Sequence, residues 1–269
     1  MPFVFSDQHI EQYRTLGYTV FRQILPPALL TDLRSASEEA RIIARQQNGP
    51  QTQRLQPVGQ AAIEQQAFID YAELAPLNDA IHRLLSPAHR HGNRDVLGIL
   101  LEPAEQPYCT QWHRDWRDNV TGLNLSTWDA HFLDDRYFNQ VNCALYADAC
   151  TWVVPGSHLR GDLPREIERF PERPITRPAL ENGSYEEREY ACLDYVRSMP
   201  GAVQLHLDAG DFCLYRNTLW HLGNYVPHGR RATLHDAVDT DEFAAWRTEA
   251  LAEAAARREK GFGMENPNA

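Results

Sequence analysis

The segment from Trp112 to Trp116 places a histidine and an aspartate two residues apart, at His113 and Asp115. In an extended chain, side chains at positions i and i+2 point to the same face. An imidazole and a carboxylate on one face can take two neighbouring positions on a metal ion. A second histidine would complete the facial triad typical of non-haem iron(II) chemistry, which leaves positions open for substrate and oxygen.

His221 is the candidate for the third ligand. An apolar run ends at Tyr215 and a turn passes through Asn217, so we expect His221 to open a returning strand. It lies 108 residues after His113, a separation that suits neighbouring strands of a barrel better than a linear metal motif. A His-x-Asp tripeptide alone is a weak signal, so the metal interpretation depends on these three side chains meeting in the fold.

Arg230 and Arg231 open the last expected strand, nine and ten residues after His221. A buried arginine there could bind a carboxylate with both arms of its guanidinium. Only one of the two can point into a barrel, because alternate residues of a strand face opposite sides. We expect the other to form a surface ion pair.

The elements that must position these residues fall into a helical part and a strand-rich part. From about residue 93 to 238, short apolar or alternating runs are separated by Gly, Pro, Asp and Asn, a pattern typical of a sandwich or barrel. Before it, the residue pattern predicts helices at 6–17, 26–49 and 76–85, a strand at 17–25 and a weakly patterned stretch at 50–75. A last helix is expected at about 240–260.

The stretch 159–200 interrupts the predicted strands. It is rich in arginine, acidic residues and proline, and it is too polar for a core layer. We expect a long loop, of the kind that often closes over a functional site.

The length of 269 residues allows one large domain or two small ones. We predict a single domain over 1–269, with a helical part at about 1–92, the barrel at about 93–238 and the C-terminal helix. The net charge of −11 disfavours nucleic acid as a partner. The only lysine is Lys260, in a polar tail, which excludes chemistry based on a lysine Schiff base.

The N-terminus has neither a basic segment nor a long apolar run, so we expect no secretory signal and no membrane partner. Five cysteines occur without a Cys-x-x-Cys motif. A cytoplasmic protein with unpaired cysteines is the simplest interpretation.

Several motifs resemble the phytanoyl-CoA dioxygenase family of Fe(II)/2-oxoglutarate oxygenases. The stretches QWHRDW, ALYADACTWVVPGSH, GDFCLYRNTLWH and GRRATLH follow one another in that family's order, and the resemblance spans roughly residues 6–237. The segment Val154 to His158 points to this family in particular. The resemblance implies a mainly β fold with flanking helices, a double-stranded β-helix (jelly roll, cupin-like) with N-terminal helices packed on it.

By the same resemblance, His113, Asp115 and His221 are the iron ligands and the catalytic centre, with Fe(II), 2-oxoglutarate and O2 as cofactors. Arg230 resembles the arginine that binds the distal carboxylate of 2-oxoglutarate, because the family's pattern turns the first arginine inward. A competing register places Arg231 inside.

On the neighbouring strand, Asn142 resembles an inward polar position that contacts 2-oxoglutarate. Gln140 faces the same way, and the sequence does not separate the two. The chain departs from the family at Gly223, where several members have a serine that helps to hold the cosubstrate carboxylate.

The predicted function is oxidation of a small organic molecule at an unactivated C–H bond, most simply hydroxylation. Halogenases of the superfamily lack the metal-binding carboxylate, so Asp115 favours hydroxylation, desaturation or ring closure. The alternatives are a Zn- or Mn-dependent hydrolase or isomerase on the same barrel, and a non-catalytic cupin-like binding protein.

Overall fold

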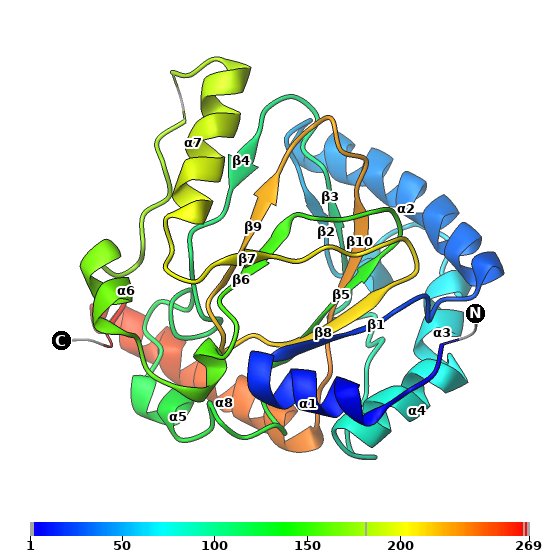
Figure 1. Cartoon of the computed structure of the whole chain (residues 1–269), viewed down its shortest axis with the longest axis horizontal. Coiled ribbons are helices and arrows are strands. Elements are labelled where there is room, and N and C mark those ends of the chain that lie inside the picture. The colour runs from blue at the N-terminus through cyan, green and yellow to red at the C-terminus, as the bar shows by residue number, and fades with distance from the viewer. Residues whose placement is uncertain (1–2, 181, 266, 268–269) are drawn as a thin grey trace.

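Two antiparallel sheets form the centre of the molecule (Figure 1). The structure is a computed structural model that describes residues 3–180, 182–265 and 267. The larger sheet has the strand order β1-β8-β5-β10-β3-β2, and the smaller has the order β4-β9-β6-β7. The larger sheet contains β1 (Tyr18–Phe21), β2 (Arg54–Leu55), β3 (Gly98–Leu101), β5 (Asn139–Ala144), β8 (Phe212–Arg216) and β10 (Ala232–Ala237). The smaller sheet contains β4 (Tyr108–Cys109), β6 (Thr151–Val153), β7 (Val203–Gln204) and β9 (His221–Tyr225). The predicted jelly-roll fold is thus confirmed.

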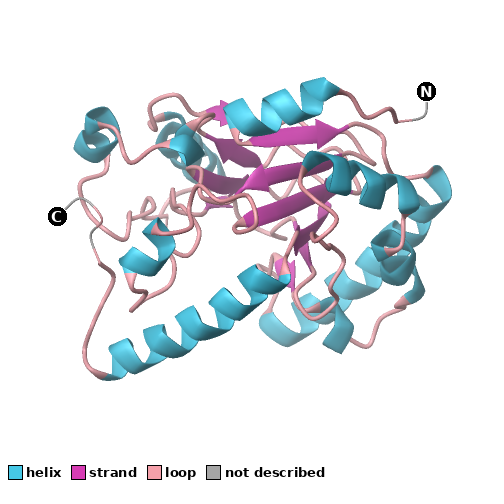
Figure 2. Cartoon of the chain, turned by 90° about the horizontal axis from the view of Figure 1, so that it is seen from below, coloured by secondary structure: helices cyan, strands magenta, loops and turns pink. Residues whose placement is uncertain are grey.

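Helices flank the sheets, as Figure 2 shows from a second direction. They are α1 (Asp7–Leu16), α2 (Pro27–Asn48), η1 (Val58–Gln60), α3 (Gln66–Ala72), α4 (Ala75–Leu84), α5 (Leu125–Asp129), η2 (Ser157–Leu159), α6 (Pro164–Arg169), α7 (Tyr185–Arg197) and α8 (Asp241–Glu259). The helices expected near both ends of the chain are present, while α5 was not expected. No helix in the described part of the chain is long and apolar enough to cross a membrane.

The apolar face of α2 packs on the outer face of the larger sheet. Leu33 of α2 belongs to the same buried cluster as Ile99 of β3 and Leu234 of β10. Because side chains alternate along a strand, burying Leu234 against the helices turns its neighbour Thr233 toward the other sheet. The space between the sheets therefore receives the polar residues of these strands.

Strand β2 forms one edge of the larger sheet, in a stretch where the sequence pattern was weak. Arg54 pairs with Leu100 of β3, and Leu100 pairs with Thr233 of β10. These three residues form one row across the sheet. The next residue, Leu55, points to the opposite face, where it belongs to the buried cluster beneath the helices. Arg54 thereby joins the row that faces the space between the sheets.

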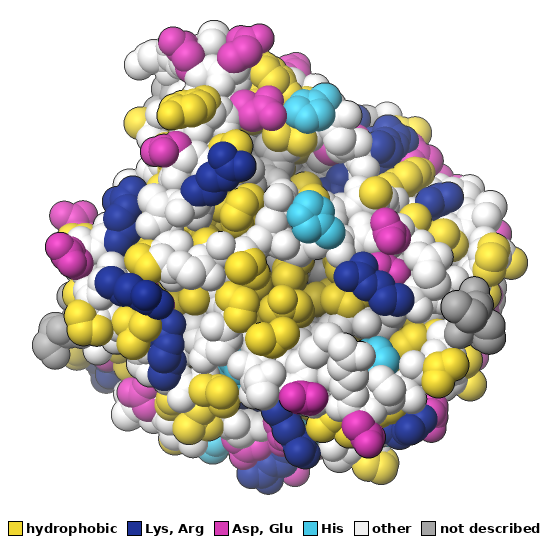
Figure 3. Space-filling model, in the orientation of Figure 1, with side chains coloured by type: hydrophobic (Ala, Val, Ile, Leu, Met, Phe, Trp, Pro, Cys, Tyr) yellow, Lys and Arg dark blue, Asp and Glu magenta, His cyan; other side chains and the backbone are white. Residues whose placement is uncertain are grey.

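The stretch 159–200 contains α6 and α7, so the expectation of a loop outside the core is wrong. Phe170, Cys192 and Tyr195 are buried in one cluster with Trp112 and Trp220. The few apolar residues of the stretch form this contact with the barrel, and most of its polar residues lie on the outer surface. Acidic side chains gather over α7 at the upper left of Figure 3, while hydrophobic ones gather in the middle of that face.

Candidate metal centre

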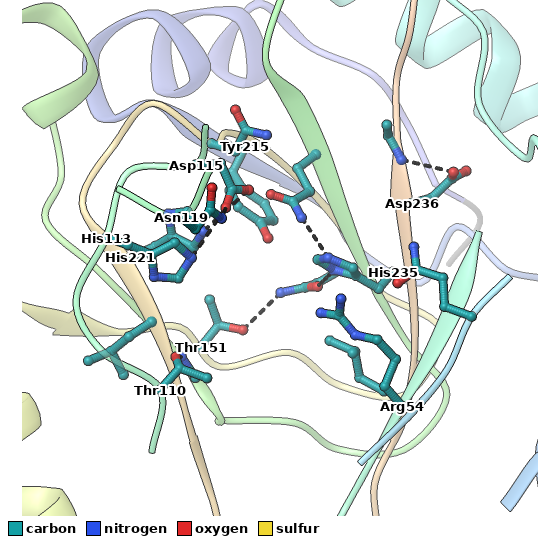
Figure 4. A pocket seen from close by; sticks show the side chains of 18 of the residues that line it. Arg54, Thr110, His113, Asp115, Asn119, Thr151, Tyr215, His221, His235 and Asp236 are labelled. Carbon is teal, nitrogen blue, oxygen red and sulfur yellow. Dashed lines mark hydrogen bonds and ion pairs between the residues drawn. The ribbon is translucent and has the colours of Figure 1, made fainter. Parts of the chain in front are cut away.

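His113, Asp115 and His221 meet at one end of a pocket between the two sheets (Figure 4). One ligand atom from each residue lies within 4.8 Å of the others. Nε2 of His113 is 3.3 Å from Oδ1 of Asp115, and Nε2 of His221 is 3.7 Å from Oδ2 of the same carboxylate. Two imidazoles and one carboxylate at this spacing can hold a single metal ion on one side and leave its other side open.

Backbone pairing brings the two histidines together. The amide of His113 donates to the carbonyl of His221 at 3.1 Å, and the amide of His221 donates back at 3.0 Å. The amide of Asp115 donates to the carbonyl of Asn217 at 2.9 Å. The strand expected through this motif is shorter than predicted, because β4 ends at Cys109 and a turn begins at Asp115.

Hydrogen bonds orient the three side chains. In each histidine, Nδ1 lies 2.9 or 3.0 Å from the backbone carbonyl oxygen two residues earlier. With a proton on Nδ1, that nitrogen donates and leaves the lone pair of Nε2 for a metal. Nδ2 of Asn119 donates to Oδ1 of Asp115 at 2.6 Å, which fixes the carboxylate.

The protonation states also suit a metal. Burial lowers the pKa of His221 to about 4, so its ring is neutral at neutral pH. Burial opposes ionisation of Asp115, yet the adjacent imidazoles of His113 and His221 hold the pKa of this carboxyl below its ordinary value. A neutral imidazole and an ionised carboxylate are the forms that ligate metals.

The pocket has a volume of about 490 Å³, in the range of small-molecule sites. Its polar wall comes from the inner faces of β5, β8 and β10. Its apolar wall includes Trp116, Val120 and Phe243, the last from α8. The C-terminal helix thus contributes directly to the pocket.

Arg231 lies in this pocket, whereas Arg230 does not. The side chain of Arg231 is 3% exposed, and its Nε donates to Oδ2 of Asp148 at 2.9 Å. Its Nη1 is buried and has no hydrogen-bond partner in the described part of the chain. The side chain of Arg230 is 48% exposed and pairs with Glu38. The expectation that Arg230 points inward is therefore wrong.

The packing of β10 explains this correction. Ala232 and Leu234 are buried in the apolar cluster against the helices. The residues that alternate with them, Arg231 and Thr233, must then face the pocket. Thr233 donates its hydroxyl to Oδ2 of Asp148 at 2.6 Å, and this carboxylate holds both side chains.

Asn142 and Gln140 both line the pocket. The side-chain amide of Asn142 donates to Oγ1 of Thr151 at 2.9 Å, and its Oδ1 lies 3.0 Å from Nδ1 of His235. Nε2 of Gln140 lies 2.6 Å from the other ring nitrogen of His235. His235 was not among the site residues predicted from the sequence, yet it is a member of this chain of polar groups inside the pocket.

Two further pocket residues were missed from the sequence. Arg54 points into the pocket in Figure 4, and it makes no ion pair or hydrogen bond within the described ranges. Tyr225 stacks on Tyr108 and lies under the guanidinium of Arg231, 4.7 Å from ring centre to Cζ. A Cβ at Gly223 would collide with the hydroxyl of Tyr225, so this tyrosine occupies the space beside the glycine. Only the alternation of side chains along β9, which puts Tyr225 on the same face as His221, could have pointed to this tyrosine in the sequence.

A double-stranded β-helix with a His-Asp-His site at one end of its pocket defines a class of non-haem metalloenzymes. The family model described as "Phytanoyl-CoA dioxygenase (PhyH)" matches residues 13–226, and the chain belongs to this family. The family uses Fe(II), 2-oxoglutarate and O2, so the chain is a 2-oxoglutarate-dependent enzyme. No curated protein matches it significantly in sequence.

Solved structures share the fold at low sequence identity. AviO1 from Streptomyces viridochromogenes Tue57 is 16% identical with a TM-score of 0.57, over 89% of this chain and 97% of its own. SnoK, a non-heme alpha ketoglutarate dependent carbocyclase from nogalamycin biosynthesis, is 19% identical with a TM-score of 0.50, over 88% and 84%. The epimerase SnoN, in complex with Fe3+, alpha ketoglutarate and nogalamycin RO, is 15% identical with a TM-score of 0.52, over 87% and 83%.

Proposed function

We propose that this protein is an Fe(II)- and 2-oxoglutarate-dependent dioxygenase that oxidises an unactivated C–H bond of a small organic molecule, most directly by hydroxylation. The observation that carries the proposal is the joint presence, in one pocket, of the triad and of a buried arginine with an unpartnered Nη1. The first can hold iron, and the second can hold a carboxylate.

His113, Asp115 and His221 would hold the iron. The donor set fits, because it combines two imidazole nitrogens, that of His221 held neutral by burial, with one ionised carboxylate whose open side faces the pocket. When bound, iron supplies the oxidation of a C–H bond by O2, coupled to conversion of 2-oxoglutarate into succinate and CO2. The role of the protein at this centre is to keep the three ligand side chains in place, as Asn119 does for Asp115.

Arg231 would bind the distal carboxylate of 2-oxoglutarate. Asp148, itself held by the Thr233 hydroxyl, accepts a hydrogen bond from Nε of the guanidinium and leaves Nη1 for a ligand. The Tyr225 hydroxyl lies where a family serine would reach the cosubstrate, and we propose that it replaces this serine. Asn142 is a further proposed contact, and its side-chain amide reaches across to Thr151 of the smaller sheet.

The remaining space would receive the substrate. Trp116, Val120 and Phe243 offer an apolar surface that excludes water, and Arg54 offers a cation without an ion-pair partner in the described chain. These features favour a substrate with an apolar body and an anionic group. We propose that the helices, the barrel and the insert act as one domain, since α8 contributes Phe243 to this wall.

Succinate formation tests the proposal. The protein with Fe(II) and 2-oxoglutarate should produce succinate in air and none without O2, and Asp115→Ala should abolish it. A library of small carboxylic acids under 18O2 should contain a compound that gains one labelled oxygen atom. A metal-dependent hydrolase would produce no succinate under either atmosphere, and this result would refute the proposal.

A further inference from the structure

A buried ionic cluster lies behind the metal centre, and it is built around a carboxylate of the insert. Arg114, Arg117 and Arg173 each bring a guanidinium nitrogen to Asp162, at 3.2, 3.0 and 2.9 Å respectively. The side chains of Arg114 and Asp162 are 0% exposed. Burial opposes ionisation of Asp162, yet the three arginines hold its pKa well below the ordinary value, so the carboxylate is charged at neutral pH.

Two of these arginines belong to the metal-binding motif. Arg114 stands between His113 and Asp115, and Arg117 follows two residues after Asp115. Nη1 of Arg114 also donates to the carbonyl of Thr218, at 2.7 Å. Thr218 lies three residues before the third ligand. Arg114 therefore connects the segment that carries the first two ligands with the segment that carries the third.

A second carboxylate of the insert reaches the third ligand segment. Oε2 of Glu166 accepts a hydrogen bond from Nε1 of Trp220 at 3.1 Å, and Trp220 immediately precedes His221. The guanidinium carbons of Arg114 and Arg117 lie 5.0 and 4.8 Å from the centre of a Trp220 ring. The indole is thus held by Glu166 at its N–H and by the arginines at its faces.

We propose that Asp162 and Glu166 are positioning residues, through which the insert fixes the two ligand-bearing segments of the metal centre relative to each other. Without the charge of Asp162, three buried guanidinium groups would repel one another more strongly, with Asp118 and Glu166 as the carboxylates left near them. Arg114 would turn away and move the backbone on either side of it, where His113 and Asp115 lie. The inference rests on the proposed function in one respect, that the triad binds a metal.

Metal affinity is the property that tests this role. Co(II) serves as the probe, titrated under anaerobic conditions and followed by its visible absorption, at a temperature where circular dichroism shows each variant to be folded. Loss of a group that hydrogen-bonds a metal ligand costs about 10–100-fold in metal affinity. Asp162 acts through Arg114 and not on a ligand directly, so we expect Asp162→Asn to weaken Co(II) binding by about tenfold, the lower end of that range, and to change the absorption spectrum. Glu166→Gln should give a smaller loss, and Asp162→Glu should restore part of the affinity. Glu168→Gln, a change at an exposed position of α6, the helix that carries Glu166, is the matched control.

A second variant keeps the test decisive if Asp162→Asn does not fold. The double change Asp162→Asn with Arg173→Gln removes one buried cation together with the anion, and Arg173 lies outside the metal-binding motif. Folded variants that bind Co(II) as tightly as the wild type, with only a lower melting temperature, would overturn the inference, because the cluster would then stabilise the insert alone. A wild-type protein that binds no Co(II) or Fe(II) would overturn the proposed function as well.

Discussion

The two adjacent arginines immediately before β10 have opposite environments. Arg231 is buried beside Asp148, whereas Arg230 lies on the surface beside Glu38. When a buried arginine that binds an anion is removed, its contact with the anion is not replaced, because water cannot reach the vacated position. An exposed arginine is readily replaced by water and salt.

Arg231→Gln should therefore raise the KM for 2-oxoglutarate by at least about tenfold, because breaking a buried charge pair costs about 2–5 kcal/mol. Arg230→Gln should leave this KM nearly unchanged, since an exposed ion pair contributes about 0–1 kcal/mol. Steady-state succinate formation at varied 2-oxoglutarate measures both, and melting temperatures show whether the unpaired Asp148 has destabilised the fold. The opposite order for the two variants would contradict the assignment.

Tyr225 offers a finer test of the proposed contacts to 2-oxoglutarate. Tyr225→Phe keeps the ring that stacks on Tyr108 and removes only the hydroxyl beside Gly223. A lost hydrogen bond of about 0.5–1.5 kcal/mol should raise the KM for 2-oxoglutarate by roughly 2–10-fold. Tyr108→Phe is the control, because this residue does not line the pocket. Equal values for the two variants would show that the Tyr225 hydroxyl does not touch the cosubstrate.

At the scale of elements, β10 carries a buried carboxylate, Asp236. Asp236 is 3% exposed and accepts hydrogen bonds from the amides of Gly92 and Ala237. Burial raises the pKa of Asp236 from 3.8 to about 7. A raised pKa means that the folded protein favours the protonated acid, so this group stabilises the fold fully below pH 3.8 and loses that contribution as the pH rises to about 7.

Asp236→Asn should remove this pH dependence. The difference in free energy of unfolding, variant minus wild type, should increase between pH 4.5 and pH 7.5. The expected increase is on the order of a few kcal/mol, as a pKa shift of this size implies. Urea unfolding at the two pH values measures the difference. Asp79→Asn, a change at an exposed position, is the control and should show no such trend. A constant difference between wild type and Asp236→Asn would mean that the carboxyl is already ionised in the fold.

The insert shows how an element can differ from its sequence pattern. Its composition is that of a solvated loop, yet α6 and α7 bring Phe170, Cys192 and Tyr195 into a buried cluster with the barrel. The apolar residues are too few and too widely spaced to give a helical period. Their burial depends on Trp112 and Trp220, which come from distant segments of the chain.

At the scale of the whole molecule, the cysteines were expected to be unpaired, and the structure leaves all five free. Titration of denatured, unreduced protein should therefore find five reactive thiols per chain. Native protein should react far more slowly, because Cys109, Cys143, Cys192 and Cys213 are buried. Fewer than five thiols before reduction and five after it would reveal a disulfide.

The sequence by itself determined the three residues that we propose as metal ligands. His113 and Asp115 are close in sequence, so their spacing fixes their relation through local backbone geometry. His221 follows a turn and opens a strand, which is also a local signal. The jelly-roll fold could be predicted for a similar reason, because each short strand and the turn residues that bound it form a pattern within a few positions of the sequence.

Only the tertiary structure decided which arginine enters the pocket, and which residues surround the metal centre. A shift of one residue reverses both faces of β10, and the choice depends on burial of Leu234 in one apolar cluster with Leu33, 201 residues earlier in the chain. Arg54 reaches the pocket because β2 pairs with β3, and Asp162 reaches Arg114 because the insert folds against the barrel. Such contacts join residues that are far apart in sequence, so no local pattern of residue types records them.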